Sequence, residues 1–221
     1  MCGITGFVDP AADRPAAQLE TLVRAMSDAM PHRGPDDEGQ YVDPAQGLAL
    51  GFRRLAIQDL SADGHQPMRS HSGRYEIVYN GEIYNFHELR RALDADGPAQ
   101  WRGHSDTEVL LQLIERHGVA GALERVDGMF ALALYDREER RLILARDRMG
   151  EKPVYLGWSG GVFLFGSELK CLMAHDAWQP VLDSRAVSAF VRYGNVPAPY
   201  SIFQGIHKLP PGHLRCLPCA F

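Results

Sequence analysis

The second residue of the chain is a cysteine, followed by alternating small, branched and aromatic residues from Gly3 to Val8. This alternation predicts a buried strand, which would hold Cys2 in a fixed place. Removal of Met1 would leave Cys2 with a thiol and a free α-amine on one carbon. Because an α-amine titrates near about 8 and a thiol near about 8.5, the amine can act as a built-in general base. The alternative is an incidental cysteine at the start of a strand.

The stretch EIVYNGEIYN contains an Asn-Gly pair, Asn80-Gly81, between apolar residues. Such a pair is the strongest short signal for a type I′ hairpin turn. The same residues also offer two donors, a side-chain amide and a backbone N–H, that can converge on a developing oxyanion. From the residues alone, the turn is the favoured interpretation.

Two charged residues suit the recognition of an amino acid. Arg54, in FRRLAIQD, has a guanidinium that can fork onto a carboxylate, although most such arginines are solvated. Asp106 opens a helix predicted after Ser105, where acidic residues commonly complement the helix dipole. A substrate ammonium beside Asp106 is the alternative.

Other motifs give no further chemistry. The sequence has no GxxxxGK[ST] and no HExxH, so it shows neither an ATP site nor a metal site of those types. Ser159-Gly160-Gly161 is not followed by the Asp-Ser of a pyrophosphate loop, and we predict a tight turn there. Cys216 and Cys219 form a single CxxC with no second pair, which does not favour a zinc or redox site.

Composition is that of an ordinary globular protein, with 45% hydrophobic and 23% charged residues and a net charge of −5. The charge gives no general attraction to nucleic acid or anionic membranes. No apolar run approaches the roughly 18 residues of a membrane span, and the N-terminus does not look like a signal peptide. We therefore expect a cytoplasmic protein with no nucleic-acid or membrane partner.

Periodicity and turn residues predict the elements that must position these groups. Helices are expected over about 19–30, 86–94, 105–118 and 184–193, and the third has a capping box formed by Ser105 and Glu108. Strands are expected at 3–8, 40–42, 48–57, 75–79, 100–102, 154–157 and 162–165, with a hairpin over 129–146. Helices and antiparallel strands come in groups, so the class is α+β.

Taken together, the chain resembles the class II glutamine amidotransferase domain of glutamine-hydrolysing asparagine synthetases. The resemblance is carried by MCGITGF, MPHRGPDDEG, RRLAIQDL, VYNGEIYNF, HSDTEVLL, DGMFALALYD, ARDRMGEKPVY and SELK, in the family's order. It implies an N-terminal-nucleophile fold, a four-layer αββα sandwich of two antiparallel sheets. It also implies hydrolysis of the glutamine side-chain amide.

The resemblance assigns roles residue by residue. Cys2 would be the nucleophile, with Asn80 and Gly81 as the oxyanion hole. Arg54 would bind the α-carboxylate of glutamine. The remaining binding residues would be Asp106 and Glu82 for the α-ammonium, and the stretch Leu55, Ala56, Ile57 and Gln58 lining the site.

The family's second half does not follow in these residues. We expect a glutaminase domain over 1–175 and, over 176–221, a helix and a Pro/Gly-rich connector toward an absent synthetase domain. No cofactor is expected in this chain, because ATP and magnesium would belong to that missing domain. The expected partners are L-glutamine, a synthetase-type ATP-dependent domain in trans, and a second copy bound through exposed apolar residues, namely Phe190, Val191, Tyr193, Ile202 and Phe203.

Two alternatives remain open at this point. One is a catalytically inactive remnant that keeps the glutaminase fold and acts as a binding or regulatory module. The other is an N-terminal-nucleophile amidase with a different acyl substrate. Arg54 and Asp106 argue against the second, because together they suit a free amino acid.

Overall fold

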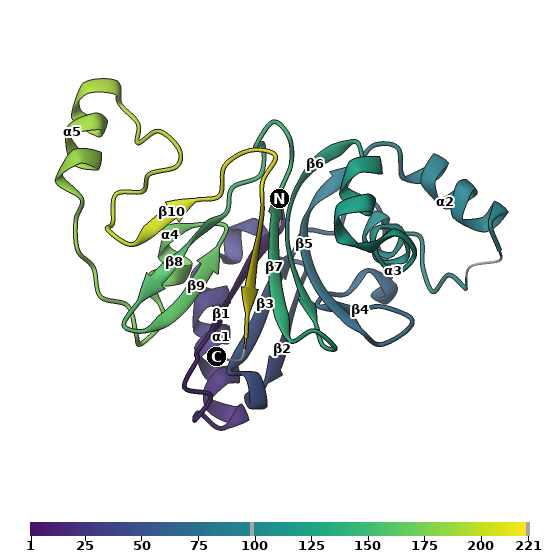
Figure 1. The fold of residues 1–221 in the computed structure, drawn as a ribbon, viewed down its shortest axis with the longest axis horizontal. Helices are drawn as coiled ribbons and strands as arrows, with labels where there is room; N and C mark the ends of the chain where they lie inside the picture. Colours follow the sequence, from purple (N-terminus) through teal and green to yellow (C-terminus); the bar gives the residue numbers. More distant parts are fainter. Residues whose placement is uncertain (98–99, 220–221) are drawn as a thin grey trace.

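The computed structural model describes residues 1–97 and 100–219, and its centre is formed by two antiparallel sheets (Figure 1). The first sheet has the strand order β10 (Ile206–Lys208), β8 (Tyr155–Ser159), β9 (Val162–Gly166), β1 (Gly3–Val8), β3 (Leu48–Arg54) and β2 (Asp37–Asp43). The second has the order β11 (Leu214–Pro218), β7 (Arg141–Arg146), β6 (Gly128–Asp136), β5 (Tyr75–Ile83) and β4 (Met68–Arg69).

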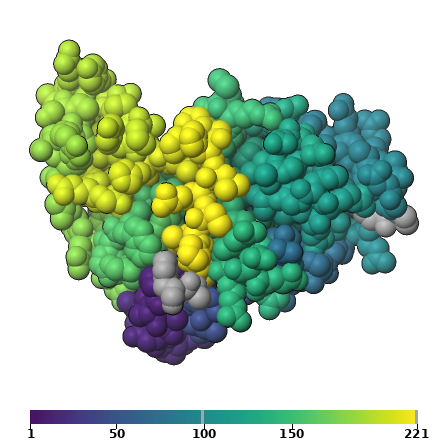
Figure 2. Space-filling view, in the orientation of Figure 1, coloured from purple at the N-terminus to yellow at the C-terminus, as the bar shows by residue number. Residues whose placement is uncertain are grey.

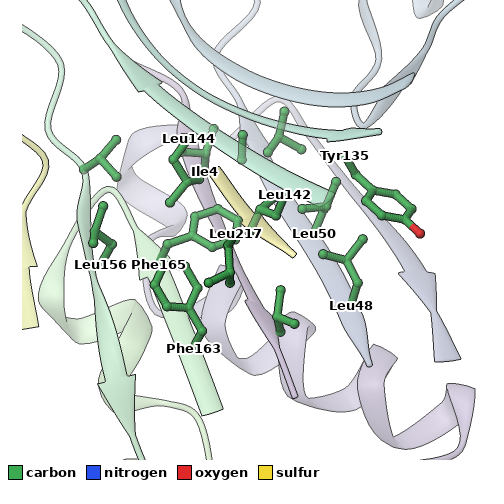
Figure 3. Close-up of a cluster of buried hydrophobic side chains, with 14 of the residues drawn as sticks. Ile4, Leu48, Leu50, Tyr135, Leu142, Leu144, Leu156, Phe163, Phe165 and Leu217 are labelled. Atoms are coloured by element: carbon green, nitrogen blue, oxygen red, sulfur yellow. The ribbon is translucent and has the colours of Figure 1, made fainter. Parts of the chain in front are cut away.

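Helices cover the outer face of each sheet. α1 (Ala16–Asp28) and α4 (Leu169–Met173) pack on the first sheet, and α2 (Phe86–Ala95) and α3 (Asp106–Arg125) pack on the second. Between the sheets lies a core of buried side chains that includes Ile4, Leu50, Leu144 and Phe165 (Figure 3). The four layers therefore follow the order αββα, as the resemblance implied.

The first strand is held on both sides. β1 pairs with β3 and β9, and all six of its residues are buried. Hydrogen bonds from Ile4 N–H to the Ser167 hydroxyl (3.1 Å) and from the Thr5 hydroxyl to the Phe165 carbonyl (3.0 Å) add to the ladder. The predicted buried strand is confirmed, and Cys2 is anchored at its start.

Most predicted elements are present. The hairpin is β6 followed by β7, and Gly160 (φ 55°) and Gly161 (φ 83°) form the turn between β8 and β9. α3 is interrupted at Gly118, with φ 70° and ψ 170°, and then continues to Arg125. The Ser105 hydroxyl caps α3 by accepting from Glu108 N–H at 3.3 Å.

The second half of the predicted capping box is wrong. The Glu108 carboxylate accepts from the backbone N–H groups of Arg102 (2.8 Å) and Gly103 (3.0 Å) instead of returning to Ser105. Residues 100–102 consequently form a loop held by Glu108, and the strand predicted there is also wrong.

The favoured hairpin turn at Asn80-Gly81 is wrong as well. Both residues lie inside β5, where Asn80 faces Ala131 and Gly81 faces Phe130 across the ladder. A Cβ at Gly81 would collide with the Met129 carbonyl and lie 2.6 Å from Cβ of Phe130. The glycine is therefore required by the close approach of β6, and no turn is involved.

The C-terminal segment contributes to both sheets. α5 (Ser184–Tyr193) forms as predicted and projects from the sheets in Figures 1 and 2. The strands β10 and β11, which the sequence did not indicate, then pair with β8 and β7. Leu217 and Cys219 reach the core between the sheets. A domain boundary near residue 175 stays a prediction, and residues 220 and 221 lie outside the described residues.

The residues expected at a dimer surface are covered to different extents. Phe190, Val191 and Tyr193 on α5 are each more than half exposed. Ile202 and Phe203 are partly covered, and the Phe203 ring meets Trp178 edge-on at 5.0 Å. Dimerisation stays a prediction. Over the described ranges, none of the helices has both the length and the apolar character to cross a membrane.

Candidate active site

A cavity of about 140 Å³ opens where the start of β1, the end of β3, the middle of β5 and the start of α3 meet. Its lining contains every residue that the sequence assigned to the site: Cys2, Arg54, Leu55, Ala56, Ile57, Gln58, Asn80, Gly81, Glu82 and Asp106. Residues far apart in the chain are thus brought together in one cavity.

Cys2 lies partly buried on this cavity. Its Sγ accepts from Leu55 N–H at 3.4 Å and lies 3.5 Å from the Leu55 carbonyl. Its own carbonyl accepts from Nε of the buried Arg33 at 3.1 Å, and Arg33 also pairs with Glu168. Burial raises the pKa of the Cys2 thiol, although the Leu55 N–H, the N-terminal charge and Arg54 oppose the shift. The thiol therefore needs a base at neutral pH.

The Asn80 side chain supplies a donor with no partner. Asn80 is 1% exposed, and its Nδ2 has no hydrogen-bond partner among the described residues. A buried unpaired donor is costly, so it needs an explanation. Its place on the cavity suggests that a ligand supplies the acceptor.

The next residue, Gly81, offers a second donor in its backbone N–H. Phe130, opposite Gly81, donates its N–H to the Asp147 carboxylate (3.1 Å), and its carbonyl accepts from the Asp147 N–H (2.9 Å), so both groups point away from β5. The Gly81 N–H therefore points away from β6. Tyr79 and Ile83 lie two residues before and after Gly81, so their N–H groups point to the same edge of β5. They donate to the side chains of Gln66 (2.6 Å) and Asp106 (2.9 Å). Gly81 N–H lies between them on the open edge of β5.

Asp106 is a buried carboxylate on the opposite wall. It accepts from Ile83 N–H at 2.9 Å and from the Tyr79 hydroxyl at 3.2 Å. Burial raises the pKa of Asp106 to about 6, and these hydrogen bonds only partly offset that effect. The expected favourable contact with the helix dipole is therefore outweighed by desolvation.

Arg54 lies at the end of β3 and is 8% exposed. Its guanidinium donates to the carbonyls of Ser61 (2.9 Å) and Asp59, and it has no ion pair among the described residues. These bonds fix the loop that follows β3. Across the cavity mouth, the Gln58 amide donates to the Glu82 carboxylate at 3.2 Å. Arg54, Glu82 and Asp106 thus bring a cation and two carboxylates to one cavity.

Among the residues around the site that the sequence did not assign, three hold or face its polar groups. Arg33 holds the Cys2 carbonyl, Tyr79 donates to Asp106, and Lys152 lines the cavity beside Met1. Arg33 and Lys152 lie within the stretches HRGPDDEG and GEKP, whose polar character is visible in the sequence but indicates no function for either residue. Tyr79 had no signal, because an aromatic residue in a strand is ordinary. Residues 1–97 and 100–219 contain no cluster of His, Cys, Asp and Glu placed to hold a metal ion.

Comparison with known proteins identifies the family. A family model described as "Glutamine amidotransferase domain" matches residues 1–219. The chain is 38% identical over 217 residues to asparagine synthetase [glutamine-hydrolyzing] 3 of Bacillus subtilis, covering 96% of this chain and 34% of that protein. It is 34% identical over 227 residues to a putative asparagine synthetase [glutamine-hydrolyzing] 2 of Methanocaldococcus jannaschii, covering 95% and 42%.

The fold is also found in a solved structure, the glutamine phosphoribosylpyrophosphate amidotransferase of B. subtilis. The TM-score is 0.66 at 20% identity, over 82% of this chain and 45% of that one. The chain spans about a third of the length of the B. subtilis synthetase and less than half of the M. jannaschii protein. On the family model and these relatives, the chain belongs to the glutamine amidotransferase domain family.

Proposed function

We propose that the chain hydrolyses the side-chain amide of free L-glutamine to glutamate and ammonia, with Cys2 as the nucleophile. The observation that carries the proposal is the convergence in one cavity of the Cys2 thiol, the unpaired Asn80 amide, Arg54 and Asp106. The same set argues against an inactive remnant, in which at least one of these groups would be expected to be lost.

Recognition follows from charge. Free glutamine carries an α-carboxylate and an α-ammonium, so its site needs a cation and an anion at fixed separation. Arg54 binds the carboxylate, while Asp106 and Glu82 bind the ammonium. Because Arg54 and Asp106 are both buried and held by hydrogen bonds, their separation is fixed before substrate arrives. This arrangement directs the amide carbon toward Cys2 and disfavours an N-acylated substrate.

The chemistry starts when Met1 is removed and the α-amine of Cys2 becomes free. The amine accepts the thiol proton as Sγ attacks the amide carbon. Asn80 Nδ2 and Gly81 N–H stabilise the resulting oxyanion. The ammonium returns its proton to the leaving nitrogen, ammonia departs and a thioester remains. Water then attacks the thioester with the amine again as base, and glutamate leaves as the proton returns to Sγ.

The fate of the ammonia lies beyond these residues. We propose that the chain is the glutaminase half of an asparagine synthase, and that an ATP-dependent synthetase domain, supplied in trans, consumes the ammonia. ATP and magnesium would be required by that domain. The chain itself would require neither, because amide hydrolysis through a thioester needs only water.

The test is glutamate release by purified protein whose loss of Met1 is verified by intact mass. Cys2→Ala is expected to abolish release and keep the fold, because the sulfur lies on the cavity and only borders the core between the sheets. Cys216→Ser, at an exposed cysteine on β11, is the matched control and is expected to retain full activity. Protein that keeps Met1 should be inactive, since its Cys2 nitrogen is an amide. Undiminished turnover by Cys2→Ala would reject the mechanism.

A substrate comparison tests the recognition part. Glutamine should be hydrolysed and N-acetylglutamine should not, because acetylation removes the charge that Asp106 and Glu82 bind. Equal rates for the two would favour the amidase with a different acyl substrate.

A further inference from the structure

Lys152 is a buried lysine on the same cavity that the proposed mechanism does not use. The residue is 6% exposed, and its ammonium lies 3.5 Å from the Met1 sulfur. Among residues 1–97 and 100–219, no carboxylate lies within ion-pair distance of it. A buried charge without a counter-ion is unfavourable, and such groups cluster at functional sites.

The loop that carries Lys152 is firmly held. The Asp147 carboxylate, 1% exposed, accepts from Lys152 N–H at 3.2 Å and from the N–H groups of Phe130, Met149 and Glu151 at 3.0–3.1 Å. The Lys152 carbonyl accepts from the Arg146 guanidinium at 2.7 Å. These hydrogen bonds fix the backbone of Lys152, so the position of its ammonium group on the cavity is set by the structure of the loop.

The position of Met1 shows what Lys152 faces. Five covalent bonds separate the Met1 sulfur from the Cys2 nitrogen, a span of at most about 6.5 Å. The lysine ammonium thus lies within roughly 10 Å of the atom that becomes the α-amine. When Met1 leaves, the lysine loses the neighbour it has in this structure and faces the space beside that amine.

The other charged groups around the cavity favour the wrong form of the amine. Asp106 and Glu82 are acidic and stabilise an ammonium, which cannot accept the thiol proton. The Asp59 carboxylate is occupied by Ser61 and by His104 N–H. Arg54 is turned toward the carbonyls of Ser61 and Asp59, and Arg33 pairs with Glu168. Lys152 is thus the cation left without a carbonyl or carboxylate partner within the described part of the cavity.

We infer that Lys152 is a positioning residue for the nucleophile: its charge keeps the α-amine of Cys2 unprotonated, and so basic, at neutral pH. The inference rests on the proposed function. It assigns Lys152 no contact with glutamine and no covalent step.

The test compares Lys152→Met, which keeps the length and removes the charge, with Lys152→Arg, which keeps the charge. The kcat/KM for glutamine is measured from pH 5.5 to 9.5 on protein lacking Met1. In Lys152→Met the acid limb should move up by about one pH unit, which lowers kcat/KM about tenfold near pH 6.5 and little near pH 9. Lys152→Arg should keep the wild-type limb. Lys208→Met, at a lysine on β10 outside the cavity, is the matched control.

A second readout does not need turnover. Protein labelled with [3-¹³C]cysteine reports the titration of Cys2 by NMR, with the resonance assigned by its loss in Cys2→Ala. The amine titration should move upward in Lys152→Met and stay in place in Lys152→Arg. A protein that releases no glutamate would defeat the proposed function, while this titration would still decide the role of Lys152.

Three outcomes would overturn the inference. The first is an unchanged acid limb and titration in Lys152→Met. The second is an equal loss of kcat/KM at every pH, which is the mark of a structural role. The third is a Lys152→Arg variant that behaves like Lys152→Met, because charge would then not be the property that matters.

Discussion

Asn80→Ala tests two effects of one side-chain amide: its effect on the free energy of unfolding and its effect on kcat. Asn80 Nδ2 is buried, lines the cavity and has no partner among the described residues. In the resting protein Nδ2 therefore makes no hydrogen bond to the described residues and carries a desolvation cost. In the proposed transition state the same amide binds an oxyanion. The substitution should affect activity and stability in opposite directions.

The magnitudes follow from that contrast. Loss of one oxyanion donor lowers kcat by about 10²–10³-fold, equivalent to about 3–4 kcal/mol. Removing an unsatisfied buried donor relieves about 1–3 kcal/mol, part of which is offset by packing lost on truncation. The free energy of unfolding should thus stay unchanged or rise by up to about 2 kcal/mol. KM should change little, because the amide binds the reacting oxygen more tightly in the transition state than in the ground state.

The assay pairs steady-state glutamate release with urea denaturation of the same preparations. Asn85→Ala is a useful contrast, because both ends of that partly buried amide are used: it donates to the Arg125 carbonyl and accepts from Asp127 N–H. That variant should lose stability and keep kcat. If Asn80→Ala retained kcat within about threefold, or lost more than about 2 kcal/mol of stability, the interpretation of Nδ2 as a waiting oxyanion donor would be refuted.

Three further predictions concern the first turn of α3, which carries Asp106 on the cavity and Glu108 behind it. Because burial raises the pKa of Asp106 to about 6, the folded protein favours the protonated carboxyl. The contribution of Asp106 to the free energy of unfolding is therefore present at low pH and is lost as pH rises through about 6. Asp106→Asn should therefore raise stability at pH 8 by up to about 3 kcal/mol in urea unfolding, while raising KM for glutamine at least about tenfold; a KM within twofold would contradict the ammonium contact. The wild-type KM should rise as pH falls below 6, and a flat KM from pH 5 to 8 would show that Asp106 does not bind the substrate. Glu108→Ala leaves the N–H groups of Arg102 and Gly103 unpaired, so it should lower the free energy of unfolding by about 2–4 kcal/mol and leave kcat unchanged. A fall in kcat without destabilisation would instead tie Glu108 to the chemistry.

Local patterns were sufficient for the elements whose neighbours in sequence are also their neighbours in space. The hairpin of β6 and β7, the turn at Gly160-Gly161 and the helices starting at Phe86, Asp106 and Ser184 all depend on short-range signals. The ordered set of motifs then assigned the candidate site residues, and every one of them lies on a single cavity, while their roles stay predictions.

Long-range pairing could not be predicted in this way. Asn80-Gly81 has the local signature of a turn, and only the approach of β6 shows that the glycine serves a strand. The partners of β10 and β11 are strands from 49 to 77 residues earlier in the chain, and the proline-rich sequence around them has no alternation. The roles of Arg33 and Lys152 likewise depend on contacts with the N-terminus that span 31 and 151 residues.

The short β4 explains how the sheet makes a site. β4 pairs with β5 only at Ile77 and Glu76, so the edge of β5 is open from Tyr79 onward. Unpaired edge N–H groups must find other acceptors. Gln66 and Asp106 supply them at Tyr79 and Ile83, and among residues 1–97 and 100–219 no side chain accepts in the same way from the Gly81 N–H between them. The oxyanion donor that we propose at Gly81 is thus a consequence of where the β4–β5 ladder stops, because its N–H lies on the open edge between two neighbours that side chains hold in place.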